Sequence, residues 1–316
     1  MMKFLQLDVQ WESQVINLWN RELSSDFPMR DTLFKQNSIQ DPSVLSSGSY
    51  LAVNEQDQVI GFIISKYVQE KTEALANREI GWIQALLVDS HFRKNGIGSA
   101  LLERAEKALE KQGCKTIFLG RDLAHYFPGI PLQFEGTKEW FEKRGYQASG
   151  IESDLIRIFA PDEKFVFQKP KDIEVALIEN KDELVSFLHR CFPGRWEYEA
   201  KQYFENGGTG REFVVFRKNN KIIGFCRIND PESPIIGPNV YWAPLFNERV
   251  GGVGPLGIDK EERKNGYGLE IVKAGISFLR ERQINTIIID WTGLLDFYKK
   301  IDFKVWKQYQ QYSKQI

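Results

Sequence analysis

A six-residue glycine pattern occurs twice in this chain, as Arg93-Lys94-Asn95-Gly96-Ile97-Gly98 and as Arg263-Lys264-Asn265-Gly266-Tyr267-Gly268. Each copy follows an apolar run typical of a strand and precedes apolar residues at helical spacing. A glycine turn that opens a helix points several unpaired backbone N–H groups at one place, where the helix dipole adds positive potential. Two copies in matched surroundings therefore predict phosphate binding, although a single copy would be weak evidence.

The two copies lie 170 residues apart, and the repeat extends beyond them. At the same offset Leu102 aligns with Val272, Leu109 with Leu279 and Ile117 with Ile287. This period is too long for a solenoid unit, and each half is long enough to hold a core of its own. We therefore expect two domains of one fold, residues 1–160 and 161–316, joined by a proline-containing, charged stretch at 161–172.

The elements that position the two loops follow the same order in each half. A strand precedes each loop (80–89 and 250–259) and a helix follows it (97–111 and 267–282). Another strand (115–119 and 286–290), a short helix (137–144 and 294–300) and a last strand (within 146–159 and 305–312) complete the order. The pattern predicts a mixed α/β fold in each half, with a central sheet flanked by helices.

Composition limits the classes of function. With 42% apolar and 27% charged residues, the chain has the composition of an ordinary globular protein. A net charge of −1 argues against nucleic-acid binding, and the three histidines show no metal-ligand spacing, so we expect no metal. The three cysteines are scattered, and neither a signal-peptide apolar region nor a membrane-length apolar run is present. We expect a reduced, cytoplasmic protein that does not bind a membrane.

The order of strand, Arg-x-x-Gly-x-Gly loop, helix, strand and aromatic short helix resembles the GNAT superfamily of acyltransferases. The matching residues are 88–99 with 140–146 in the first half and 258–269 with 297–303 in the second. The resemblance covers nearly the whole chain and identifies it as a tandem member of this superfamily. A Rossmann dinucleotide site would require a third glycine, which neither copy has.

The resemblance implies that acetyl-CoA is the acyl donor. The loop amides would bind its pyrophosphate, with Arg263 and Lys264 adding charge, and the strand before the loop would splay from its neighbour to offer amides to the pantetheine arm. The implied contacts in the second half are Leu256, Gly257, Ile258 and the loop Arg263, Lys264, Asn265, Gly266, Tyr267 and Gly268. In the first half they are Leu86, Leu87, Val88, Arg93, Lys94, Asn95, Gly96, Ile97, Gly98 and Ser99. Whether the first half binds CoA at all is left undecided by the sequence.

A tyrosine in the last short helix commonly protonates the departing thiolate in this superfamily. The second half has such a residue, Tyr298, in Phe297-Tyr298-Lys299-Lys300. The aligned first-half segment carries Phe141, which has no proton to give. The resemblance therefore implies that Tyr298 is the general acid and that residues 161–316 form the catalytic domain.

Asp290 is a second difference between the halves, because Gly120 stands at the aligned position. Many superfamily members have an asparagine there, so the CoA contact that asparagine often makes is in doubt. A carboxylate at the end of this strand could orient or deprotonate a cationic amine. A strand-end aspartate that only caps a turn is the alternative interpretation.

Two further segments are candidates for acceptor binding. Tyr241 and Trp242 lie in an aromatic run that could stack on a sugar, and a packed loop is the alternative. Arg195 and Trp196 lie between the two early helices of the second half, where this superfamily usually shapes its acceptor pocket. A solvated arginine is the alternative there.

The sequence thus predicts direct transfer of acetyl from acetyl-CoA to the primary amine of a small molecule. The strand end Asp290-Trp291-Thr292, followed by the helix that contains Phe297 and Tyr298, looks similar to glucosamine N-acetyltransferases. This resemblance favours an amino sugar such as glucosamine as the acceptor. A catalytically degenerate CoA-binding scaffold and a tandem-fold aminoacyl-transferase of peptidoglycan synthesis remain as alternatives. We expect a monomer or a homodimer.

Overall fold

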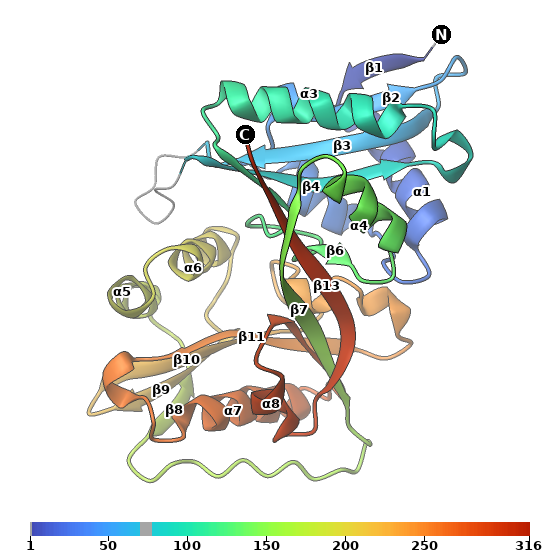
Figure 1. Cartoon of the computed structure of the whole chain (residues 1–316). Coiled ribbons are helices and arrows are strands. Elements are labelled where there is room, and N and C mark those ends of the chain that lie inside the picture. The colour runs from blue at the N-terminus through green and yellow to red at the C-terminus, as the bar shows by residue number, and fades with distance from the viewer. Residues whose placement is uncertain (1, 70–77) are drawn as a thin grey trace. The chain divides into compact units, whose positions relative to one another are not determined.

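The computed structural model describes residues 2–69 and 78–316 (Figure 1). The chain forms two compact units: unit 1 is Met1–Glu152 with Gln308–Ile316, and unit 2 is Ser153–Lys307. These units differ from the predicted ranges 1–160 and 161–316 in the strand segments that they include. Among the described residues, no helix is both long and apolar enough to span a bilayer.

Unit 1 contains one sheet with the strand order β1-β2-β3-β4-β5-β13. Its pairs are antiparallel except for β4 and β5, which are parallel. The elements in chain order are β1 (Lys3–Gln6), α1 (Glu12–Leu23), α2 (Asp31–Phe34), β2 (Tyr50–Val53), β3 (Val59–Tyr67), β4 (Ile80–Val88), α3 (Ile97–Lys111), β5 (Thr116–Leu119), β6 (Ile130–Pro131), α4 (Glu135–Glu142) and β7 (Gln147–Ile158).

Unit 2 repeats this plan with the order β7-β12-β11-β10-β9-β8, in which only β11 and β12 are parallel. Helices α5 and α6 cover one face of its sheet, and α7 and α8 cover the other (Figure 1). The elements are β8 (Glu174–Leu177), α5 (Lys181–Cys191), α6 (Arg195–Glu205), β9 (Phe213–Lys218), β10 (Lys221–Asn229), β11 (Val250–Ile258), α7 (Tyr267–Glu281), β12 (Thr286–Thr292), α8 (Leu295–Lys299) and β13 (Lys304–Gln315).

Local sequence explains the elements that frame the site. Asn219 and Asn220 both have positive φ, as the tight turn between β9 and β10 requires. Helix α7 buries Ile271, Val272 and Leu279, whose spacing places them on one face against the sheet. The predicted mixed α/β fold is confirmed, and most predicted elements have the expected bounds to within a few residues. The helical turns of residues 31–39 and the short strand β6 were not predicted.

The parallel strands of each unit separate before they end. In unit 2 the pairing of β11 with β12 stops at Gly252 and Ile288, although β11 continues to Ile258. In unit 1 the pairing of β4 with β5 stops at Ile83 and Leu119, although β4 continues to Val88. The splay implied by the resemblance is therefore present in both units. We call the wedge between the separated strands the fork.

The last strand of each sequence repeat completes the sheet that is built mainly from the other repeat. Ser313, Lys314 and Gln315 of β13 pair with β5 in unit 1. Leu155 to Ile158 of β7 pair with β12 in unit 2. The division predicted at residue 160 places both strands with their sequence neighbours instead. The repeat alone gives no sign of the exchange, because β7 and β13 occupy equivalent places in the linear order.

Candidate functional site

The second glycine loop has a backbone that only a few residue types favour. Lys264 and Gly266 have φ of 69° and 77°, and a Cβ at Gly266 would meet open space. The glycine is therefore required by its backbone angle rather than by crowding. Arg263 Nε donates to the carbonyl of Ile258 (3.1 Å) and Asn265 Nδ2 to that of Glu262 (3.2 Å). The first hydrogen bond ties the loop to the end of β11, and the second lies within the loop.

This loop delivers the amino end of α7 with its amides available. Gly266 supplies no side-chain cap, so the first-turn N–H groups of a 15-residue helix have no intrahelical partner. Arg263 and Lys264 are exposed beside them, and among the described residues Arg263 has no ion pair. Unpaired amides, a helix dipole and two free cations form a fitting site for a pyrophosphate group.

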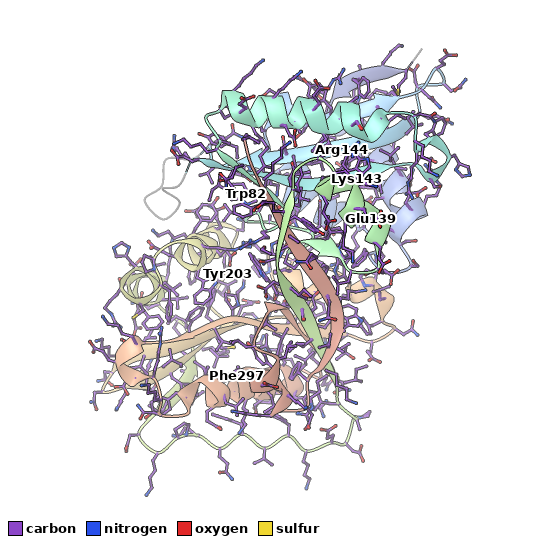
Figure 2. The ribbon with its side chains drawn as sticks, viewed as in Figure 1. Trp82, Glu139, Lys143, Arg144, Tyr203 and Phe297 are labelled. Atoms are coloured by element: carbon purple, nitrogen blue, oxygen red, sulfur yellow. The ribbon has the colours of Figure 1, made fainter. Side chains whose placement is uncertain are left out.

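The first loop copies this backbone but not its free charge. Lys94 and Gly96 have φ of 63° and 79°, and Arg93 Nε donates to the carbonyl of Val88 (2.9 Å). However, Arg93 Nη2 also donates to Glu22 Oε2 (2.6 Å), so its cation is already paired. The hydroxyl of Ser99 accepts a hydrogen bond from Arg144 at the end of α4 (2.7 Å; Figure 2). The first loop is therefore the weaker anion site.

Strand alternation decides which backbone amides face the fork. Asp259 N donates to the carbonyl of Ile223 on β10 (2.7 Å), so Gly257, two residues earlier, also directs its N–H to β10. The N–H groups of Leu256 and Ile258 therefore point away from β10 into the fork. The same argument in unit 1 places the amides of Leu86 and Val88 in the fork and that of Leu87 in the ladder with β3.

The fork of unit 1 is filled by the chain itself. Gln84, only 2% exposed, donates to the carbonyls of Asn37 and Ala124 (both 2.9 Å) and accepts from Ser38 Oγ (2.9 Å). The loop after β5 lies against Gly120, where a Cβ would overlap the carbonyl oxygen of Phe127. A side chain at position 120 is therefore excluded, and the amide group of Gln84 already has partners within unit 1.

The fork of unit 2 carries the opposite pair of residues. Gly254 stands at the repeat position of Gln84, and Asp290 at that of Gly120. Asp290 Oδ1 lies 3.8 Å from the point that a Cβ on Gly254 would occupy, so the carboxylate faces a position with no side chain. A glycine has thus replaced the residue that fills the fork, and a carboxylate has replaced the glycine opposite it.

Surrounding protein atoms and charges hold the pKa of Asp290 near neutral pH. The pKa of Asp290 is raised to about 7, mainly by burial and then by the charge of Asp154. Glu199 adds to this increase, whereas a backbone hydrogen bond and Arg195 oppose it. The residue keeps partial exposure to solvent. A carboxylate with a pKa near the working pH is suited to exchanging a proton with an amine.

Tyr298 lies on α8, on the face of the sheet that α7 covers. It follows Phe297, which is labelled in Figure 2. Its ring stands at 4.9 Å and 85° from that of Phe297, and the Trp140–Phe141 pair of unit 1 has 4.9 Å and 88°. Tyr298 and Phe141 are also equally buried, at 5% exposure. The two positions are therefore equivalent, and only unit 2 has a hydroxyl there.

Burial raises the pKa of Tyr298, and the neighbouring Cys226 and Asp290 add to the effect. The hydroxyl therefore stays protonated at neutral pH and has a proton to give. Among the described residues it has no hydrogen-bond partner. Because Asp290 contributes to this pKa, the charges of the two candidate residues influence each other.

Of the predicted acceptor residues, one lies beside Asp290. Arg195 begins α6, donates through Nε to Glu199 (2.6 Å) and lies 4.8 Å from the Trp291 ring centroid. Trp196 instead packs against Phe192 in the core under α5 and α6. Tyr241 and Trp242 are buried in the turns after β10. A role in acceptor binding stays a prediction for all four.

Sequence reasoning missed two carboxylates at this place, Asp154 on β7 and Glu199 on α6. Glu199 could have been found, because its spacing of four residues from Arg195 on a helix predicts an ion pair. For Asp154 the only signal was a charged residue beside the apolar part of a strand.

Comparison with known proteins identifies the family. Residues 13–127 and 181–303 match the model of the acetyltransferase (GNAT) family. The chain therefore belongs to this family, with one domain copy in each matched region. The expected tandem organisation and acyltransferase class are confirmed at this level.

Individual relatives match less of the chain or are distant. An amino-acid acetyltransferase of Azotobacter vinelandii (strain DJ / ATCC BAA-1303) is 32% identical over 78 residues, which are 25% of this chain and 15% of that protein. A GCN5-related glucosamine N-acetyltransferase region of a fungal multi-domain GH3 β-N-acetylglucosaminidase has a TM-score of 0.87 at 24% identity, covering 99% of this chain and 38% of that one. A tandem GNAT protein of the clavulanic acid pathway has a TM-score of 0.70 at 15% identity, covering 100% and 98%. These solved structures share the fold.

The unequal forks predict one CoA site per chain. Replacing Gly266 and Gly268 by valine should abolish CoA binding, because valine is strained at positive φ and its side chain would crowd the amides. The matched substitutions Gly96→Val and Gly98→Val should leave binding unchanged. Titration calorimetry measures both, with circular dichroism to verify folding. An undiminished stoichiometry after the unit 2 substitutions would refute the site assignment.

The raised pKa of Asp290 predicts a stability cost that grows with pH. The folded protein holds this proton until about pH 7, whereas the unfolded chain releases it near its ordinary value, so ionisation opposes folding above that value. The unfolding midpoint of Asp290→Asn relative to wild type should therefore rise between about pH 4 and about pH 8. Thermal unfolding checks this, with the exposed Asp296→Asn as control. A difference independent of pH would contradict the prediction.

Proposed function

We propose that this protein transfers acetyl from acetyl-CoA directly to the primary amine of a small molecule, in the cytoplasm, and that unit 2 carries the reaction. The observation that carries the proposal is the joint presence of an open fork, Asp290 and Tyr298 behind the second glycine loop. Unit 1 has the loop but none of the other three. Its role in the proposal is structural support.

Asp290 prepares the nucleophile. Amines enter as ammonium ions near neutral pH, and an ammonium ion cannot attack a carbonyl group. The Asp290 carboxylate attracts the cation and accepts one proton from it, which frees the nitrogen lone pair. A pKa of about 7 allows Asp290 to be ionised when the acceptor arrives and to hold the proton afterwards.

Backbone amides and Tyr298 serve the other half of the reaction. When acetyl-CoA is bound it supplies the thioester that the amine attacks. An amide of Leu256 or Ile258 in the fork is placed to donate to the thioester oxygen, and such a donor stabilises the developing oxyanion by ~3 kcal/mol. Tyr298 Oη then gives its proton to the departing thiolate. As the amide forms, the nitrogen loses its second proton, which restores the Tyr298 hydroxyl, and the proton held by Asp290 passes to water. The products are the N-acetyl compound, CoA and one released proton.

An amino sugar such as glucosamine is the proposed acceptor. The glucosamine N-acetyltransferase region with the same fold along 99% of this chain supports that choice. The short match to an amino-acid acetyltransferase supports an amino acid as the second candidate. Three free cysteines among the described residues fit a reducing compartment. The intact Tyr298 and Asp290 argue against a degenerate scaffold or an aminoacyl-tRNA-dependent enzyme.

The direct test is acetyl-CoA consumption measured by thiol release over amino sugars, amino acids, polyamines and aminoglycosides. We expect the highest kcat/KM for an amino sugar and N-acetyl product by mass spectrometry. Highest activity on an amino acid would favour the second candidate. If CoA binds but none of these amines is acetylated, the scaffold alternative gains support.

Tyr298→Phe should lower kcat by about 10- to 10⁴-fold, because the thiolate would leave without a proton donor. The substitution removes one oxygen from a buried site, so the fold and CoA affinity should persist. Tyr50→Phe, at a half-buried position in β2 of unit 1, is the control and should keep wild-type kcat. Unchanged turnover of the Tyr298 variant would remove this residue from the mechanism.

A further inference from the structure

The strand β12 contains an irregularity next to Asp290. Ile289 pairs with Leu155 of β7, and the next registered pair is Thr292 with Ser153. Asp290 and Trp291 together therefore stand opposite the single residue Asp154, which defines a β-bulge. Trp291 has φ of +43°, an uncommon value for a residue with a large side chain. A bulge of this kind redirects the side chains at its position.

Asp154 holds the bulge through its side chain. Trp291 N, displaced from the regular ladder, donates to Asp154 Oδ1 at 3.0 Å. Asp154 is only 6% exposed, and removing a carboxylate from water is costly unless hydrogen bonds or other interactions offset it. A neutral residue with an acceptor oxygen could also accept from Trp291 N, so the hydrogen bond and the charge of Asp154 can be varied separately.

The charge of Asp154 acts on Asp290. After burial, it is the largest influence that raises the pKa of Asp290. Glu199 on α6 raises that pKa as well, Arg195 on the same helix lowers it, and Tyr298 faces Asp290 from α8. Three carboxylates and one arginine therefore surround the fork, leaving an excess of negative charge for a cationic acceptor.

We propose that Asp154 is a positioning residue of the acceptor site: it fixes the bulge that presents Asp290 at the fork, and its charge makes Asp290 a stronger base toward the acceptor's ammonium group. The inference rests on the proposed role of Asp290. The proton passes from the ammonium nitrogen to Asp290, and Asp154 acts on this transfer through its charge and not as the acceptor of the proton. The acceptor class that follows is a compound whose reactive amine arrives as a cation.

Two substitutions separate the two roles of Asp154. Asp154→Asn keeps an acceptor oxygen for Trp291 N and removes only the charge. Asp154→Ala removes both the charge and the hydrogen bond. The matched control is Glu281→Gln, which removes an exposed carboxylate from α7 of the same unit.

The expected readout is the pH profile of kcat/KM. Without the neighbouring charge, the pKa of Asp290 falls, so the acidic limb of the Asp154→Asn profile should move to lower pH by roughly one unit. The plateau should also fall, because Asp290 becomes a weaker base. Asp154→Ala should lose more activity than Asp154→Asn, and Glu281→Gln should match wild type. An acidic limb that does not move in Asp154→Asn would overturn the proposal.

A second readout does not depend on knowing the acceptor. Carboxyl carbon NMR can follow the titration of Asp290, assigned with Asp290→Asn, in wild type and in Asp154→Asn. The Asp290 pKa should be lower in Asp154→Asn by roughly one unit. If Asp290 titrates identically in both proteins, the inference fails whatever the enzyme acetylates. If no amine is acetylated but the titration shifts, the proposed function fails and the coupling of the two carboxylates stands.

Discussion

The early end of the pairing between β11 and β12 is the constraint on which the rest of unit 2 depends. Backbone N–H and C=O groups require partners, and separating two parallel strands at Gly252 and Ile288 removes the partners of those beyond. The amides of Leu256 and Ile258 are thereby left to face the fork. In the proposed complex, carbonyl oxygens of the pantetheine arm of CoA accept hydrogen bonds from these amides, and the glycine loop after the same strand supplies the proposed phosphate site.

Unit 1 meets the same constraint with its own residues. Gln84 uses its amide to bond Asn37, Ser38 and Ala124, and the loop after β5 closes against Gly120. Lys66, fully buried, joins this polar cluster through Asp41 (2.8 Å) and Asp122 (2.7 Å). Gln84 therefore occupies in unit 1 the place where unit 2 has Gly254 and no side chain. The difference between the units therefore lies in a few side chains, not in the fold.

Local sequence was sufficient for the features that depend on local chemistry. Both glycine loops, helix α3 and the position of Tyr298 against Phe141 followed from residue type and spacing, and α3 has the predicted bounds. The filled fork of unit 1 was beyond reach, because it depends on where residues 37–38 and 124 fold back on Gln84. The exchange of β7 and β13 was also beyond reach, since two similar last strands do not reveal their partners. Asp154 was missed for that reason: its strand was assigned to the other domain.

The strand exchange gives a physical reason why both repeats persist when the residues for chemistry lie in one. Unit 2 takes residues 153–158 from the first repeat, and with them Asp154, whereas unit 1 takes residues 308–316 from the second. Without the first repeat, residues 161–316 would leave β12 without its antiparallel partner and Asp290 without its neighbour. An unpaired edge strand is a liability in any sheet, and here it would lie beside the proposed catalytic carboxylate. The first repeat thus supplies unit 2 with the partner strand of β12 and with Asp154, although the fork of unit 1 is itself filled.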